Sequence, residues 1–356
     1  MPGLVSVVIP CHNSQAFIDE TITSLQHQTY SLAEYIFVDD GSTDNTRDVI
    51  LKYAQNDSRI SLVDNPERGA GSSRNLGAER AVGDYLIFLD SDDFFETDLL
   101  SSMVCSMEES GSDIAICEFS FYLDKTNKTK CGTTNLKNIP SPTTAEAIAN
   151  QLLKNIQYSP WNKMIRADYW KQTGIRFQNC RLANDFFAMF ELIVKSNVIS
   201  IVDKSLVNYR IRETGSIQNK KSEYPLALLE PFENGIFIDP EIMGVGWRRR
   251  LASNVFASVM RSNLDSFSYN SVRRDVWSAL QNSAVCRTII DEGENCSSIL
   301  NRSFIECLKF MSFEEFQPYL LRVTKICRSM PVIASRPVTV AVMVAAFVKR
   351  INGAKK

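Results

Sequence analysis

Three carboxylates follow a single apolar segment of the chain. Tyr85–Leu89 has five bulky uncharged residues, and it leads directly into Asp90, Asp92 and Asp93, with only Ser91 between them. Carboxylates this close repel one another unless they are in water or share a cation. Their hard oxygens suit Mg²⁺ or Mn²⁺, which bind one or two protein carboxylates together with waters and the phosphates of a substrate. A metal site is one interpretation, and a solvated acidic loop at the start of a helix is the alternative.

The turn Arg68–Asn75, "RGAGSSRN", has groups that suit an anion. A glycine-rich turn that opens a helix directs backbone N–H groups and the positive end of the helix dipole toward a bound anion, and Arg74 adds a guanidinium. The pattern is neither G-x-G-x-x-G nor that of a P-loop, so it does not support dinucleotide binding or an ATPase. An ordinary turn is the alternative.

Alternating strand and helix patterns must position these groups. Amphipathic segments such as residues 17–25 and 46–54 separate short apolar segments, and Asn13 or Ser14 is the expected N-cap of the first helix. The expected strands are Val5–Ile9, Tyr35–Val38, Ile60–Val63, Tyr85–Leu89 and Ile114–Cys117. Because parallel strands need a crossover connection, the alternation predicts an α/β fold with a doubly wound, mostly parallel sheet flanked by helices.

Polar residues follow three of these expected strands. Pro10–Asn13 follow the first, Asp39–Ser42 the second and Asp90–Asp93 the fourth. The carboxyl ends of parallel strands lie at one edge of a sheet, where open α/β sheets bind their ligands. We therefore expect the three loops to form one site.

Composition narrows the class of protein. A globular chain of 356 residues is long enough for two domains, and its formal net charge of −2 gives no support to nucleic-acid binding. Nine cysteines occur without a CxxC pair or a histidine cluster, so we expect reduced thiols and no zinc site. No segment has the roughly 18 apolar residues of a membrane span, and the N-terminus lacks the pattern of a signal peptide. The expected location is the cytoplasm.

The C-terminal segment is both basic and apolar. After Glu315 the sequence has eight basic residues and no acidic one, and Val338–Val348 is apolar except for Thr339. A helix of this kind is buried in protein or lies in a membrane interface whose anionic lipids attract the basic flanks. Both a packed helix and peripheral contact with the inner face of the cell membrane are therefore expectations.

Four segments, in this order and spacing, resemble family 2 glycosyltransferases with a GT-A fold. They are "SVVIPCHNSQAFIDETITSLQHQTY", "IFVDDGSTDNT", "GSSRNLGAERAVGDYLIFLDSDDFF" and "SPWNKMIRADYW". The resemblance covers roughly residues 4–217 and implies a Rossmann-like GT-A sheet. It also implies inverting transfer of a sugar from a nucleotide diphosphate, usually a UDP-sugar, with Mn²⁺ or Mg²⁺. The implied acceptor is a glycan of the cell surface or a lipid-linked molecule.

The resemblance also implies roles for individual residues. Asp40 resembles the carboxylate that reads the base, and Arg74 the arginine near the base or diphosphate. Asp90 matches a residue that contacts ribose or the metal, and Asp92 matches the direct metal ligand. The other implied nucleotide-binding residues are Pro10, His12, Asn13, Ser91 and Arg212, the last preferred over Arg210 as the basic residue of a closing loop.

Asp185 of "RLANDFFAMF" matches the catalytic base of the family, although Asn184 stands where glutamate is usual. Inversion needs a base on the face of the sugar opposite the leaving diphosphate, because the acceptor hydroxyl must lose its proton as it attacks. The alternative is that Asp185 caps a helix whose aromatic residues pack in the core. Trp161–Lys163 match a motif on the acceptor side of the family.

Two domains follow from these patterns. Residues 1–217 are expected to form the catalytic GT-A domain, and residues 218–356 a mainly α-helical region with a basic, apolar tail. The prediction is an inverting, metal-dependent glycosyltransferase, with a second copy of the chain as an additional partner. The main alternative is a noncatalytic nucleotide-sugar-binding or assembly protein. A nucleotidyltransferase would show an early basic, glycine-rich loop, and none is present near Pro10.

Overall fold

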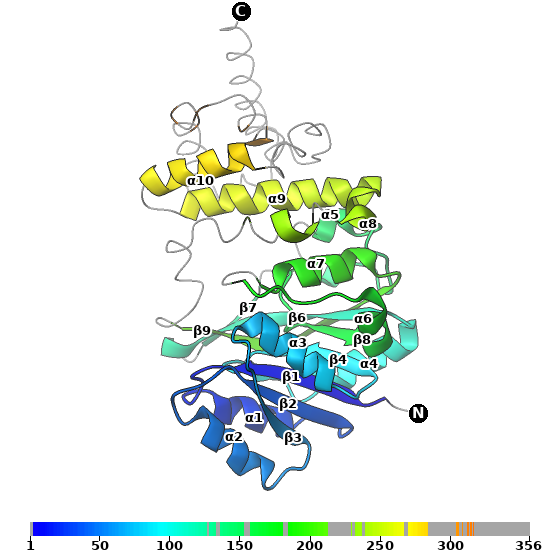
Figure 1. Cartoon of the computed structure of the whole chain (residues 1–356). Helices are drawn as coiled ribbons and strands as arrows, with labels where there is room; N and C mark the ends of the chain where they lie inside the picture. Colours follow the sequence, from blue (N-terminus) through cyan, green and yellow to red (C-terminus); the bar gives the residue numbers. More distant parts are fainter. Residues whose placement is uncertain are drawn as a thin grey trace, which may run out of the picture. The chain divides into compact units, whose positions relative to one another are not determined.

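The computed structural model describes residues 3–126, 128–132, 136–152, 157–180, 184–212, 232–236, 239–266 and 270–283, together with residues 229, 304, 305, 308, 312, 314 and 316. The chain divides into two compact units, Met1–Asn219 and Lys220–Lys356. The first unit contains all the described strands of a nine-stranded sheet (Figure 1).

The first half of the sheet is parallel, as the sequence predicts. Its four strands have the order β3-β2-β1-β4, and every neighbouring pair is parallel. Their bounds are β1 Val5–Cys11, β2 Ala33–Asp39, β3 Ile60–Asp64 and β4 Tyr85–Phe88. The connecting helices are α1 Ile18–Gln26, α2 Thr46–Ala54 and α3 Ala70–Arg80. The alternation of short apolar segments and amphipathic segments therefore identified these elements correctly.

The second half of the sheet is mixed, whereas the β-α alternation of the sequence predicts a mostly parallel sheet. Strand β8 (Lys163–Arg166) lies antiparallel between β4 and β6 (Ile114–Leu123). Strand β9 (Ile199–Ile211) pairs parallel with β6, while β5 (Phe94–Phe95) and β7 (Lys128–Cys131) add antiparallel pairs. Antiparallel neighbours need no crossover helix, so the β-α alternation gives no signal for them. Because β8 is antiparallel to both β4 and β6, these two strands run in the same direction, and β9, which is parallel to β6, shares it.

Helices cover both faces of the sheet. Helices α1, α2 and α4 (Leu99–Ser110) share a core with Val7 and its same-face neighbours on β1. On the other face α3 packs so closely that a Cβ on Gly77 would lie 2.2 Å from Val8 Cγ1. Helix α6 (Ala167–Thr173) lies on that second face, because Trp170 contacts Phe88 at 5.3 Å between ring centroids.

Three further elements of the first unit bear on the site or its surroundings. Helix α7 (Phe186–Lys195) lies next to α6, since Tyr169 donates a hydrogen bond to the carbonyl of Leu192. Helix α5 spans Ala149–Leu152. Helix α1 begins at Ile18, and neither Asn13 nor Ser14 caps it with a side chain, contrary to expectation. The backbone carbonyl of Ser14 instead accepts from Phe17 and Ile18.

The described part of the second unit is helical, as expected. Its helices are α8 Pro240–Met243, α9 Gly246–Ser266 and α10 Asn270–Asn282. Asp239 caps α8 by accepting from the Glu241 N–H, and Trp277 stacks on Phe316 at 4.1 Å. Among the helices that the structure describes, none is long and apolar enough to cross a membrane. The expectation for the tail Val338–Val348 lies outside the described residues.

Candidate active site

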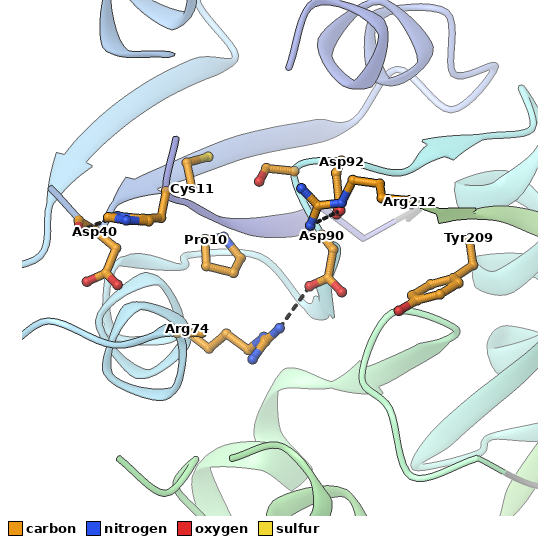
Figure 2. A pocket seen from close by; sticks show the side chains of 11 residues that line it. Pro10, Cys11, Asp40, Arg74, Asp90, Asp92, Tyr209 and Arg212 are labelled. Atoms are coloured by element: carbon orange, nitrogen blue, oxygen red, sulfur yellow. Dashed lines mark hydrogen bonds and ion pairs between the residues drawn. The ribbon is translucent and has the colours of Figure 1, made fainter. Parts of the chain in front are cut away.

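A pocket lies at the carboxyl edge of the sheet, where β1, β2, β4 and β9 end (Figure 2). The three predicted loops meet there, since β1 pairs parallel with both β2 and β4. The residues that line the pocket are Pro10, Cys11, His12, Asp40, Ala70, Arg74, Asp90, Ser91, Asp92, Tyr209 and Arg212. Of the predicted site residues, Asn13 and Asp185 are not among them. Tyr209 also lines the pocket, and no motif of the sequence predicts a role for it.

Two arginines form ion pairs with the carboxylates of Asp90 and Asp92 in the acidic loop. Arg74 Nη2 lies 2.8 Å from Asp90 Oδ1, and Arg212 Nη2 lies 2.8 Å from Asp92 Oδ2 (Figure 2). The Arg74 side chain is only 7% exposed, and its Nε is buried without a hydrogen-bond partner among the described residues. A buried donor of this kind favours binding of an additional acceptor group. The pocket thus contains two pairs, each of one carboxylate and one guanidinium.

The pKa values of the acidic loop reflect burial and mutual repulsion. Burial raises the pKa of Asp92, the charge of Asp90 raises it further, and Arg212 opposes both effects. Burial also raises the pKa of Asp93 well above its usual value. Asp93 is not in the pocket, and its Oδ1 accepts a hydrogen bond of 2.8 Å from the backbone N–H of Arg210. Asp90 and Asp92 therefore face the pocket, whereas the buried Asp93 stabilises the loop through the backbone of β9.

Arg210 is buried and stabilises the same loop through a hydrogen bond to its backbone. Its Nε donates to the carbonyl of Asp92 at 2.7 Å, and its guanidinium forms ion pairs with Glu20 and Asp124. The side chain is 4% exposed and contacts three aromatic rings. Arg212, two residues later, lines the pocket instead. The two arginines considered from the sequence thus have different positions, one in the scaffold and one at the ligand site.

Asp40 is tied to the turn that precedes α3. Its carboxylate accepts from the N–H of Gly69 at 2.7 and 2.9 Å and from Asn65 Nδ2 at 2.9 Å. Gly69 has a φ of 110°, which favours glycine. Asn13 Oδ1 accepts from the Thr43 N–H at 2.8 Å, so Asn13 holds the loop after β2 and does not line the pocket.

Asp185 stands at the N-cap position of α7, but its side chain makes no capping hydrogen bond. Its carboxylate is close enough to Arg74 and Asp90 for their charges to affect it: burial raises the pKa of Asp185, Arg74 lowers it and Asp90 raises it. The adjacent Asn184 Oδ1 accepts from Arg74 Nη1 at 2.9 Å. The fold therefore brings the start of α7 next to the arginine and aspartate of the pocket, over 90 residues away in sequence.

The acidic loop fits a divalent cation that is shared with a phosphate ligand. Among the described residues no group of three or more Asp, Glu, His or Cys side chains could hold a metal ion. Asp90 and Asp92 nevertheless form a pair of oxygen donors, and Mg²⁺ and Mn²⁺ commonly take only one or two protein carboxylates with waters and phosphates. Each of the two carboxylates forms an ion pair with an arginine, so both oxygen donors lie where a cationic group is stabilised.

Comparison with known proteins agrees with this fold and site. The model of the glycosyl transferase family 2 matches residues 6–174. The putative teichuronic acid biosynthesis glycosyltransferase TuaG of Bacillus subtilis is 34% identical over 220 residues, which are 61% of this chain and 82% of TuaG. Glycosyltransferase GlyG of Streptococcus pneumoniae is 26% identical over 247 residues, 64% of this chain and 76% of GlyG.

Solved structures show the same architecture. The crystal structure of S. aureus TarS 1-349 in complex with UDP-GlcNAc has a TM-score of 0.74 and 20% identity, over 90% of this chain and 92% of that one. The mixed sheet with its flanking helices is thus a GT-A fold. The family model and the similarity to TuaG define the class, which is that of glycosyltransferases. The chain belongs to glycosyltransferase family 2, and it is a transferase enzyme.

Proposed function

We propose that the protein is an inverting, metal-dependent glycosyltransferase that moves a sugar from a UDP-sugar to a hydroxyl of a surface polysaccharide or a lipid-linked acceptor. The observation that carries this proposal is the pairing of Asp90 with Arg74 and of Asp92 with Arg212 in one pocket. A metal-bound diphosphate needs carboxylates for the cation and arginines for the phosphates, and this pocket has both.

The proposed donor lies along the pocket from Asp40 to the acidic loop. Asp40 accepts a hydrogen bond from the base, while Pro10, His12 and Asn13 form or support the wall beside the base and ribose. Asp92, with Asp90, would hold the metal ion, and Ser91 lies between them in the loop. Arg74 and Arg212 bind the diphosphate. A bound Mn²⁺ or Mg²⁺ stabilises the negative charge that develops on the leaving diphosphate.

Asp185 acts as the base in this proposal. Its carboxylate takes the proton of the acceptor hydroxyl as that oxygen bonds to C1 of the sugar, and the bond from C1 to the diphosphate oxygen breaks with inversion. A base works best when its pKa is near the working pH, and burial raises the pKa of Asp185 in that direction. The lack of a capping hydrogen bond also favours this role over a purely structural one.

The names of similar proteins support the choice of donor and acceptor. TuaG is named for teichuronic acid biosynthesis, and TarS was crystallised with UDP-GlcNAc. The solved structure of a mannosyltransferase from Pyrobaculum calidifontis, with a TM-score of 0.52 and 12% identity, is a complex with GDP-Man and Mn²⁺. We also propose that the protein is cytoplasmic and that its basic tail binds the inner face of the membrane. Residues 1–217 form the catalytic domain in this proposal, and residues 218–356 form a helical region.

Calorimetric titration with UDP tests the metal site. Asp92→Asn removes one anionic ligand, so we expect a much larger loss of UDP affinity with Mn²⁺ than with EDTA, because contacts to the base survive. Asp168→Asn is the matched control, since Asp168 is exposed on α6. This helix follows β8, whose last residue pairs with the first residue of β4, so α6 begins at the end of the sheet away from the pocket. Equal losses with and without metal would contradict the assignment.

A noncatalytic nucleotide-sugar-binding or assembly protein is the second candidate, because Asn184 replaces the usual glutamate next to the proposed base. Asn184 pairs with Arg74 without adding charge, which is compatible with binding alone. Turnover separates the two. Native protein with Mn²⁺ is incubated with UDP-, GDP- and dTDP-sugars, and nucleotide release is measured; release from one donor supports the enzyme, and binding without release supports the alternative.

A further inference from the structure

Tyr209 occupies the part of the pocket that the proposed nucleotide and metal contacts leave unassigned. It lies near the end of β9 and lines the same pocket as Asp40 and the acidic loop. In Figure 2, Asp40 and Tyr209 lie at opposite sides of the view, with Asp90, Asp92 and Arg212 between them. A nucleotide sugar is a linear molecule, with the diphosphate between the nucleoside and the sugar. If the base is at Asp40 and the diphosphate at the acidic loop, the sugar comes next, at Tyr209.

The ring of Tyr209 has a fixed position. Trp161 packs against it with centroids 5.3 Å apart and planes at 30°, and Phe121 meets it edge-on at 6.1 Å. Trp161 itself is 4% exposed and packs edge-on against Phe119 at 4.7 Å. Tyr209 is only half-buried, in contrast to this support. A rigid ring of this kind loses little conformational entropy when a ligand packs on it.

A buried lysine holds the segment that supports this ring. Lys163 Nζ donates to the carbonyls of Gln157 and Ser159, both at 2.6 Å, and to Asn162 Oδ1 at 2.7 Å. Asn162 Nδ2 in turn donates to the carbonyl of Cys117 on β6 at 2.8 Å. Trp161 lies between these anchored residues, so its position is set by hydrogen bonds to the sheet.

The hydroxyl of Tyr209 has a pKa above its usual value. Burial raises its pKa, and the charges of Asp90, Asp93 and Asp92 raise it further. At neutral pH the side chain is therefore a phenol, which can donate and accept hydrogen bonds. A protonated hydroxyl next to carboxylates suits hydrogen bonding with sugar hydroxyls, and the ring suits the apolar C–H face of a pyranose.

We propose that Tyr209 is a sugar-positioning residue: its ring packs against the transferred sugar of the donor and determines which sugars are accepted. This inference rests on the proposed function, because it assumes that the pocket binds a nucleotide sugar. It adds a residue between the diphosphate site and the acceptor, and it assigns to Trp161 and Lys163 the task of holding that residue in place.

The experiment compares UDP with UDP-sugars on the full chain. Native protein, Tyr209→Leu, Tyr209→Phe and Tyr209→Trp are titrated with UDP, UDP-glucose, UDP-galactose and UDP-N-acetylglucosamine in the presence of Mn²⁺. We expect Tyr209→Leu to change UDP affinity by no more than about twofold and to weaken the preferred UDP-sugar about tenfold, from loss of the aromatic contact. Tyr209→Phe retains the ring and most of the affinity. Tyr53→Leu on α2, outside the pocket-lining residues, is the matched control and changes neither.

Three results would overturn the inference, in different ways. Equal weakening of UDP and UDP-sugar by Tyr209→Leu would mean that the ring supports the nucleotide or the pocket as a whole. Unchanged affinity for every sugar would mean that the ring does not touch the sugar. Failure of the native chain to bind any uridine nucleotide would refute the proposed donor, and this inference with it. If Tyr209→Leu does not fold, Tyr209→Trp decides, since an enlarged ring must alter the order of preference among the three sugars without altering UDP affinity.

Discussion

The ion pair between Arg212 and Asp92 leads to a prediction with opposite signs for metal and nucleotide. Arg212 Nη2 lies 2.8 Å from Asp92 Oδ2, and the two side chains are 29% and 22% exposed. The proposed metal ion needs the same carboxylate, so the guanidinium competes with it. Arg212→Met removes the charge but keeps a long side chain that can still pack against Phe17, over whose ring Arg212 lies at 5.3 Å. Free protein should then bind Mn²⁺ more tightly.

The size of the effect follows from the geometry of this pair. Two unit charges about 4 Å apart interact by about 4 kcal/mol at an effective dielectric constant of 20. Because both side chains are partly exposed, solvent reduces the net value of the pair to about 1 kcal/mol, or about a fivefold gain in Mn²⁺ affinity. Loss of a charge-assisted hydrogen bond to the diphosphate costs about 1.5–3 kcal/mol, so UDP affinity with Mn²⁺ should fall about 10- to 100-fold.

The assay measures both affinities on the same variant. Mn²⁺ is titrated into nucleotide-free protein and its free concentration is followed by electron paramagnetic resonance, and UDP is then titrated calorimetrically in saturating Mn²⁺. Arg176→Met is the matched control, because Arg176 forms an exposed pair with Glu79 at 2.6 Å. A loss of both affinities together, or an unchanged Mn²⁺ affinity, would refute the competition between guanidinium and metal.

Two further predictions concern the base and the scaffold. Asp185→Asn should leave UDP affinity nearly intact while the rate of transfer falls about 10²- to 10⁴-fold. Because burial raises the pKa of Asp185, the native enzyme should lose activity on acidification at a higher pH than it would with an ordinary aspartate as the base. Full transfer by the variant, or loss of activity only at the usual pKa of a carboxylate, would exclude Asp185 as the base. Arg210→Met leaves the carbonyl of Asp92 without its buried donor and removes the guanidinium that pairs with the partly exposed Glu20 and Asp124, so it should lower the free energy of unfolding by about 1–3 kcal/mol. Urea denaturation measures this, with Arg176→Met as the exposed control, and a loss no larger than the control's would contradict the structural role.

Much of the first half of the fold is predictable from the sequence, because its signals are local. Apolar strand segments followed by amphipathic helices define β1 to β4 within one or two residues at most ends, and helix α2 spans Thr46–Ala54 as predicted. Polar residues at the ends of β1, β2 and β4 must meet once those strands are parallel, so Asp40, Asp90 and Asp92 fall in one pocket. These predictions require only side-chain periodicity and the rule that parallel strands end at one edge.

The remaining features depend on contacts between distant segments. Strand β8 has only four residues, and its position between β4 and β6 follows from pairing across the sheet, not from its own pattern. This placement directs β9 toward the site and so decides that Arg212 reaches Asp92 while Arg210 is buried beneath the loop. The same pairing brings Tyr209 to the pocket, and the short segment "VNYRIR" gives no indication of which of its side chains faces a ligand. The sequence by itself therefore determined the parallel strands and their carboxylates. The tertiary structure decided which arginine and which aromatic ring complete the site, because strand order and side-chain direction are set by contacts between residues far apart in the sequence, such as Tyr85 with Arg166 and Asp92 with Arg212.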